Sequence, residues 1–248
     1  MVTKSRRNTV ATRTTFLQAM PLFAQLTTDQ VERIAEDLHP RTYQRHAVIF
    51  NQDDGSQEVY IVRTGKVRIY RCTPGGNETS INLFCPGDML GEFAVIDQQP
   101  RSATAVAITT CVVWEMAGAD FLKHLRAVPE LALALSRLLV QKLRWTAAYA
   151  ETVAQYDAAG RLLHMLLLYN SQIGEVIEPG KQSRLDLALT QDDLASLVGA
   201  RREWVNRLLQ EWRRKSLLSF EGGQFIFLDL PKVEEERDRH LEGATIPL

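Results

Sequence analysis

The sequence predicts an α+β protein in which a β-rich first half, a long central helix and a mainly helical second half follow one another. Across residues 41–116, short apolar runs alternate with turn sequences such as Pro74–Asn77, which is typical of an antiparallel β-roll. Between Pro129 and Gly160 there is no further proline or glycine, so one long helix fits there. Further along, two short helical patterns flank Gly199, which is the arrangement of a helix-turn-helix.

The composition is that of an ordinary globular protein. The 248 residues are enough for two modest domains, each with its own core. Because the formal net charge is -1, any nucleic-acid binding must come from local basic patches. No stretch approaches the roughly 20 apolar residues that a membrane span needs, and the basic N-terminus lacks the apolar segment of a signal peptide. We therefore expect a cytoplasmic protein without a membrane partner.

Residue types that carry catalysis or bind metals are not grouped in this sequence. Cys72, Cys85 and Cys111 are scattered and odd in number, so they predict neither a disulfide framework nor a metal site. The 5 histidines are also scattered, and we find no nucleophile–base pair or paired-carboxylate motif. We expect no catalytic residue, no metal and no prosthetic group.

The stretch Gly87–Val106 concentrates groups that would bind a phosphorylated sugar. The residues after Gly91 suffice for one helical turn, whose free N–H groups make an anion site. Arg101 and Ser102 follow in extended chain, and an arginine can hold a phosphate by paired charge-assisted hydrogen bonds. Beside a phosphate Glu92 needs a donor of its own, and a sugar hydroxyl supplies one. The alternative is that Arg101 and Glu92 simply pair with each other across a turn.

The long helix after Pro129 has a leucine-rich face that needs a partner. Because this helix lies between a β-rich region and a helical region, we expect it to form the spine of a homodimer. A buried helix within one domain is the alternative.

Residues 190–212 predict a DNA-reading unit. Thr190 caps a first helix, Gly199 provides the tight turn, and a second helix follows. A hairpin pattern over residues 217–228 then supplies the wing of a winged helix. The alternative, a surface helix with solvated charges, accounts for neither the turn nor the wing. The side chains expected to face outward at the start of the second helix, where base edges are read, are Arg201, Arg202, Glu203, Asn206 and Arg207.

The segments Gly91–Ala94 (G-E-F-A) and Pro100–Ala105 (P-R-S-A-T-A) resemble the phosphate-binding cassette of cyclic-nucleotide-binding domains. They are most similar to the version in bacterial Crp–Fnr transcription regulators, and the resemblance extends over residues 22–228. The cysteine cluster that holds an iron–sulfur centre in the family's oxygen sensors is absent from this sequence.

The resemblance implies a role for each residue of the cassette. Gly91 and Glu92 would face the ribose of the nucleotide, and Arg101 and Ser102 would hold its cyclic phosphate. The ligand-binding residues of the cassette would be Gly91, Glu92, Phe93, Ala94, Arg101, Ser102 and Ala103.

The family's adenine-contacting pair is Thr-Ser on the dimer helix, and the matching positions here are Thr146 and Ala147. Thr146 can make its contact. Ala147 lacks the hydroxyl that reaches across to the partner's ligand, so either another contact replaces it or the effector differs. The implied allosteric effector is a cyclic nucleotide, cyclic AMP in preference to cyclic GMP.

The family's base-reading pattern is Arg-Glu with an Arg four positions beyond the Glu, which here is Arg202, Glu203 and Arg207. Arginine bidentate to guanine and glutamate accepting from cytosine is the expected chemistry. The resemblance implies a half-site similar to TGTGA, read twice by a symmetric dimer on double-stranded DNA, with RNA polymerase as a further partner.

Together these observations predict a ligand-responsive, sequence-specific transcription regulator and not an enzyme. Its alternative is a ligand-independent DNA-binding regulator of the same fold with a degenerate or retuned pocket. We expect a flexible tail over residues 1–15, a cyclic-nucleotide-binding-like β-roll sensor over 16–119, a dimerisation helix over 120–156, a winged helix-turn-helix domain over 157–232 and a second tail over 233–248.

Overall fold

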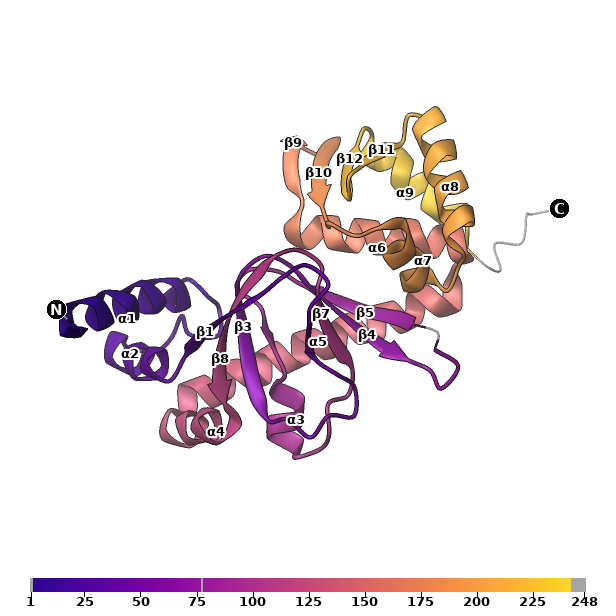
Figure 1. Ribbon diagram of the computed structural model, residues 1–248. Helices are drawn as coiled ribbons and strands as arrows, with labels where there is room; N and C mark the ends of the chain where they lie inside the picture. Colours follow the sequence, from indigo (N-terminus) through magenta and orange to yellow (C-terminus); the bar gives the residue numbers. More distant parts are fainter. Residues whose placement is uncertain (1, 77, 242–248) are drawn as a thin grey trace. The chain divides into compact units, whose positions relative to one another are not determined.

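The computed structural model describes residues 2–76 and 78–241, with side chains described from residue 10 onward. The chain divides into two compact units (Figure 1). The first unit contains Met1–Cys72 and Asn82–Leu143, and the second contains Thr73–Ile81 and Arg144–Leu248. Among the described residues, no helix combines the length and the apolar character that crossing a membrane requires.

The first unit begins with two helices, α1 (Val2–Gln18) and α2 (Thr28–Glu36). The flexible tail predicted for residues 1–15 is therefore wrong over the described part of that segment. Its polar composition did not indicate a helix, and α1 makes contacts with α2, which follows later in the chain. Arg13 donates from Nη1 to the Ala35 carbonyl oxygen at 3.0 Å, and Thr14 is buried. Helix α2 starts at a capping box formed by Thr27 and Gln30.

Two antiparallel sheets form the β-roll, which confirms the predicted architecture. The first sheet has the strand order β1 (His39–Tyr43), β8 (Cys111–Ala117), β3 (Glu58–Thr64) and β6 (Met89–Leu90). The second has the order β2 (Val48–Phe50), β7 (Thr104–Ala107), β4 (Val67–Cys72) and β5 (Glu78–Phe84). Between β6 and β7 lies the short helix α3 (Glu92–Asp97), so the predicted cassette sits inside the roll's strand series.

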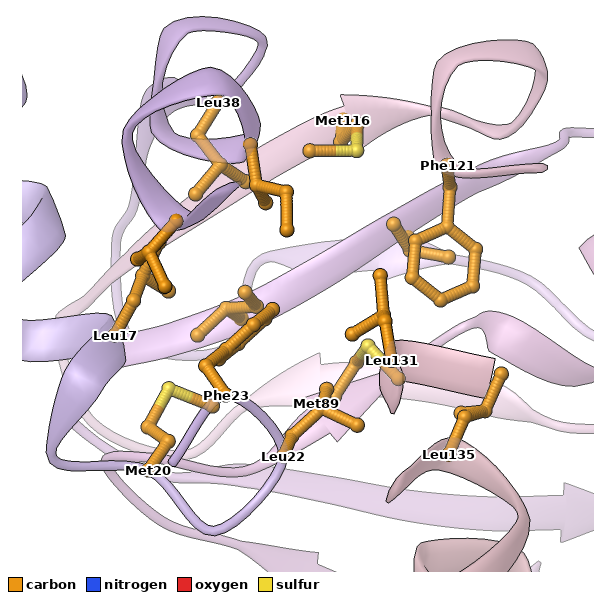
Figure 2. Close-up of a cluster of buried hydrophobic side chains, with 14 of the residues drawn as sticks. Leu17, Met20, Leu22, Phe23, Leu38, Met89, Met116, Phe121, Leu131 and Leu135 are labelled. Carbon is orange, nitrogen blue, oxygen red and sulfur yellow. The ribbon is translucent and has the colours of Figure 1, made fainter. Parts of the chain in front are cut away.

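The helix predicted over residues 120–156 is interrupted. The structure has α4 (Gly118–Ala127) and then α5 (Pro129–Gln155), with Val128 extended between them. The physical reason is Pro129, which lacks an N–H and disfavours helical backbone at the preceding residue. Leucines from the start of α5 join a core that also contains side chains from α1, α2, α4 and the first sheet (Figure 2). A second core lies between the sheets and includes Phe50, Tyr60 and Val62.

The second unit contains the predicted helix-turn-helix and wing. Its helices are α6 (Ala158–Ile173), α7 (Gln191–Val198), α8 (Arg202–Arg214) and α9 (Leu230–Asp238). Its sheet has the order β11 (Leu218–Glu221), β12 (Gln224–Phe227), β10 (Gln182–Asp186) and β9 (Glu175–Glu178), where β11 and β12 form the wing hairpin. Thr190 and Asp193 form a capping box at α7, and Gly199 ends that helix with φ 66°.

The tail predicted for residues 233–248 is also wrong over its described part. Helix α9 runs to Asp238, and Val233 is fully buried. Glu236 accepts a hydrogen bond from Lys215 Nζ at 2.6 Å, which ties α9 to the end of α8. The sequence of this segment did not indicate the contact between Glu236 and Lys215, because the two residues are 21 positions apart. Residues 242–248 lie outside the described part of the chain.

Candidate functional site

Gly91 fixes the geometry at the start of α3. It is the N-cap residue of that helix, with φ 87°, a left-handed conformation that favours glycine. A Cβ atom at this position would lie 2.7 Å from Arg101 Nη1 and 2.7 Å from the Glu58 carbonyl oxygen. Only glycine therefore allows β3, the start of α3 and the Arg101 side chain to approach this closely.

Arg101 carries a buried positive charge with several partners. Its side chain is 1% exposed. Nε donates to Ser56 Oγ at 2.9 Å, Nη1 donates to the Gly91 carbonyl oxygen at 2.8 Å, and Nη2 donates to Glu58 Oε2 at 3.2 Å. The guanidinium carbon lies 4.4 Å from the centre of the Phe50 ring. The guanidinium is thus held in a fixed orientation, which is what recognition of a phosphate requires.

Glu92 is a buried carboxylate with one oxygen paired and one available. Its Oε1 accepts a hydrogen bond from Lys142 Nζ at 2.6 Å, and Lys142 also donates to the Met89 carbonyl oxygen at 2.8 Å. Oε2 is buried and has no hydrogen-bond partner among the described residues. Leaving a buried oxygen unsatisfied costs about 1–3 kcal/mol, and a ligand hydroxyl donating to Oε2 would remove that cost.

Glu92 and Arg101 are not paired with each other, which rules out the simple cross-turn ion pair. Each has its own ion-pair partner, and the sequence patterns predicted neither partner. The partners are distant along the chain: Glu58 lies 43 residues before Arg101, and Lys142 lies 50 residues after Glu92. A signal for Lys142 did exist, because it lies one helical turn before Thr146 on the same helix face.

The remaining cassette residues take different positions. Ala94 and Ala103 are buried, whereas Phe93 and Ser102 are exposed. Thr146 and Ala147 are exposed on α5, in the part of that helix that belongs to the second unit. The structure thus brings together Gly91, Glu92 and Arg101 within the first unit, and ligand contacts from Ser102, Thr146 and Ala147 stay a prediction.

Four charged side chains define this candidate effector site: Glu58, Glu92, Arg101 and Lys142. Tyr60 lies beside them, and burial, with a smaller contribution from the Glu58 carboxylate, raises the pKa of its phenol so that it stays neutral. Among the described residues there is no cluster of His, Cys, Asp and Glu that could hold a metal ion. The arrangement offers a cation for a phosphate and a carboxylate oxygen for a sugar hydroxyl.

Helix α8 presents a polar face at its N-terminal end. Val205, Leu209 and Trp212 are buried on the opposite face. Two of the outward residues touch α7: Arg202 Nη1 lies 3.7 Å from Asp192 Oδ2, and Asn206 accepts a hydrogen bond from Gln191. The outward residues predicted from the sequence, all exposed, are Arg201, Arg202, Glu203, Asn206 and Arg207.

The basic run at the end of α8 is only partly available to DNA phosphates. Arg213 and Arg214 are exposed. Lys215 instead contacts Glu211 at 2.8 Å and Glu236 at 2.6 Å, so much of its charge is offset within the protein.

Helix α5 exposes a row of apolar side chains. Leu133 is 53% exposed, Val140 50% and Leu143 68%. Leu133, Val140 and Ala147 recur every seven residues, and Ser136, Leu143 and Ala150 occupy the second position of the same heptads. This spacing is that of a coiled-coil seam, which needs a second helix to cover it.

Comparisons with known proteins match both units. A cyclic nucleotide-binding domain matches residues 40–127, and a Crp-like helix-turn-helix domain matches residues 160–236. The CRP-like cAMP-activated global transcriptional regulator of Mycobacterium tuberculosis is 28% identical over 212 residues, covering 86% of this chain and 94% of the relative. The Cyclic AMP receptor protein of Thermus thermophilus is 28% identical over 220 residues, covering 88% of this chain and 97% of the relative. The structure of FixK2 from Bradyrhizobium japonicum has a TM-score of 0.71 at 20% identity, covering 84% of this chain and 99% of the FixK2 chain. This similarity supports the fold.

Replacing Gly91 by Ala should destabilise the first unit. We expect a loss of about 1–3 kcal/mol beyond that of Gly87→Ala, because Gly91 adds a clash to the left-handed strain. Gly87 has φ 95°, but a Cβ there would meet its nearest atom, Met20 Cγ, only at 4.0 Å. Chemical denaturation of both variants measures the difference, and equal losses would contradict the close approach described for Gly91.

Replacing Lys142 by Met should leave the Glu92 carboxylate buried without its cation. We expect the free energy of unfolding to fall by about 2–4 kcal/mol. The double variant Lys142→Met with Glu92→Gln should recover much of this loss, because a neutral amide is easier to bury than a charge. Denaturant unfolding of the double-mutant cycle gives the coupling, and purely additive effects would contradict the pairing.

Proposed function

The chain belongs to the Crp–Fnr family of transcription regulators, and we propose that it is a cyclic-nucleotide-gated member that binds inverted repeats as a homodimer. Its function is DNA binding and not enzymatic turnover. The observation that carries the proposal for the effector is the buried guanidinium of Arg101 beside a buried Glu92 that has one unpaired oxygen.

The site's chemistry suits a cyclic phosphate attached to a ribose. Arg101 would bind the phosphate, because its orientation is fixed by Ser56 and the Gly91 carbonyl oxygen. Glu92 Oε2 would accept a hydrogen bond from a ribose hydroxyl. Cyclic AMP is the proposed nucleotide, because the M. tuberculosis relative is named as cAMP-activated and Thr146 matches the threonine of the family's adenine-contacting pair.

The proposed DNA interface is the outward face of α8. Arg202, Glu203 and Arg207 would read base edges in the major groove, on a half-site similar to TGTGA. A dimer would place two such helices on inverted half-sites whose centres are separated by multiples of about 10 base pairs. RNA polymerase is a proposed partner at such sites.

The proposed dimer forms along α5. Its exposed heptad positions would be covered by the same positions of a second copy. Lys142, the partner of Glu92, lies on this same helix. A ribose hydroxyl arriving at Glu92 would therefore act on the dimer helix directly, which gives the effector a physical route to the DNA-binding units.

One observation favours a second function, a ligand-independent regulator of the same fold. Arg101 and Glu92 already have ion-pair partners within the chain, so the site is electrostatically complete without a nucleotide. DNA affinity measured with and without the nucleotide decides between the two functions.

Replacing Arg101 by Ala should weaken cyclic AMP binding by about 2–3 kcal/mol, because the phosphate loses a buried charge-assisted contact. Arg63→Ala is the matched control, because it removes the same charge elsewhere in the β-roll. Arg63 lies over the ring of Trp114. Titration calorimetry measures both affinities. The wild-type chain should bind the nucleotide, and no binding, or equal losses in the two variants, would contradict the proposal.

Replacing Arg202 by Ala should cost about 1–3 kcal/mol of DNA affinity and relax the preference for one guanine. Arg214→Ala, at an exposed position suited to a phosphate, should weaken binding to all sequences alike and lower the salt dependence. Anisotropy titrations with single-base variants of a TGTGA palindrome distinguish these outcomes. If Arg202→Ala also weakened every sequence equally, the residue would be a phosphate contact.

Replacing Leu143 by Glu should prevent dimerisation, because it places a charge in the proposed apolar seam. Gln141→Glu introduces the same charge at an exposed position outside the heptad pattern and should leave the dimer intact. Sedimentation velocity gives the mass of each variant. A wild-type monomer, or a Leu143→Glu dimer as stable as the wild type, would place the interface elsewhere.

A further inference from the structure

Glu58 already forms an ion pair with Arg101, the cation that a bound phosphate would need. It is the first residue of β3, and its side chain is 37% exposed. Its Oε2 lies 3.2 Å from Nη2 of Arg101, whose own side chain is only 1% exposed. The Glu58 carboxylate is thus a partly exposed anion in direct contact with a buried cation.

The N–H groups of Arg101 donate to two neutral acceptors and to the carboxylate of Glu58. Nε donates to Ser56 Oγ and Nη1 donates to the Gly91 carbonyl oxygen, so two neutral acceptors help to orient the guanidinium. The bond to Glu58 is the only one of the three that brings a negative charge. Glu58 thus behaves as an internal anion on a cation whose position is set by other groups.

The charges of the candidate effector site sum to zero, since Arg101 and Lys142 are each matched by one carboxylate. A cyclic phosphodiester adds one negative charge to this balanced set. A phosphomonoester such as that of 5′-AMP adds about −1.5 to −2 at neutral pH. Because Coulomb repulsion from a fixed carboxylate is proportional to the charge of the ligand, Glu58 opposes the monoester more strongly than the cyclic diester.

From this geometry we infer that Glu58 is a specificity-determining residue, which lowers the affinity for all phosphate ligands and selects monoanionic cyclic phosphodiesters over dianionic phosphomonoesters. The inference rests on the proposed nucleotide function of the same site and adds the basis of its selectivity. Arg101 supplies attraction to phosphate, and Glu58 supplies discrimination by charge.

The test uses Glu58→Gln, which removes the charge and keeps an oxygen that accepts from Arg101. Glu115→Gln is the matched control. Glu115 lies opposite Tyr60 in the same sheet, with a half-buried carboxylate 3.4 Å from Arg41, so the control removes the same charge without touching Arg101. Titration calorimetry of the full-length wild type and both variants with cyclic AMP and with 5′-AMP gives the six affinities needed.

We expect Glu58→Gln to bind cyclic AMP about tenfold more tightly and 5′-AMP roughly up to a hundredfold more tightly, because the repulsion removed scales with ligand charge. Glu115→Gln should change both affinities by less than about threefold. Equal gains for the two ligands, or no gain, in a chain whose wild type binds cyclic AMP would overturn the inference and leave the proposed function standing. Nucleotide binding by Glu58→Gln but not by the wild type would support the inference and contradict gating of the native chain. No binding by either would overturn both.

Discussion

The buried guanidinium of Arg101 is the constraint on which the first unit's site depends. A charge with 1% of its side chain exposed must be neutralised and hydrogen-bonded, or it destabilises the fold. Ser56, Gly91 and Glu58 meet this need, and they bring β3 and the start of α3 together around one side chain. The absence of a Cβ at Gly91 makes that approach possible. Stability and anion recognition thus use the same cation.

The second buried charge links this site to the long helix. Lys142 pairs with Glu92 and with the Met89 carbonyl oxygen, so α5 is held to the β-roll by a contact with the residue proposed to receive the ribose. The same helix exposes Leu133, Val140 and Leu143 in a heptad pattern. A ligand hydroxyl that donates to the second oxygen of Glu92 would therefore act on the same carboxylate that holds the helix proposed to join two copies.

Local patterns were sufficient to predict the helix-turn-helix, the wing and the β-roll, because caps, turns and alternating strands depend on neighbouring residues. They failed for α1 and for the described part of the C-terminal segment, where polar sequences are stabilised by contacts such as Arg13 with Ala35 and Glu236 with Lys215. Within the site, Gly91, Glu92 and Arg101 were predictable as one compact motif. Glu58 and Lys142 were not predicted, because their roles arise from pairing across 43 and 50 residues.

We propose that effector binding and DNA binding are energetically coupled in this chain. The most direct test measures the affinity of the wild-type protein for a duplex with two inverted TGTGA half-sites, with and without saturating cyclic AMP, at one fixed salt concentration. With such coupling, the nucleotide should tighten DNA binding by roughly 5–150-fold, the usual range of an allosteric coupling. Equal DNA affinity in the two conditions would contradict it and would favour the ligand-independent regulator.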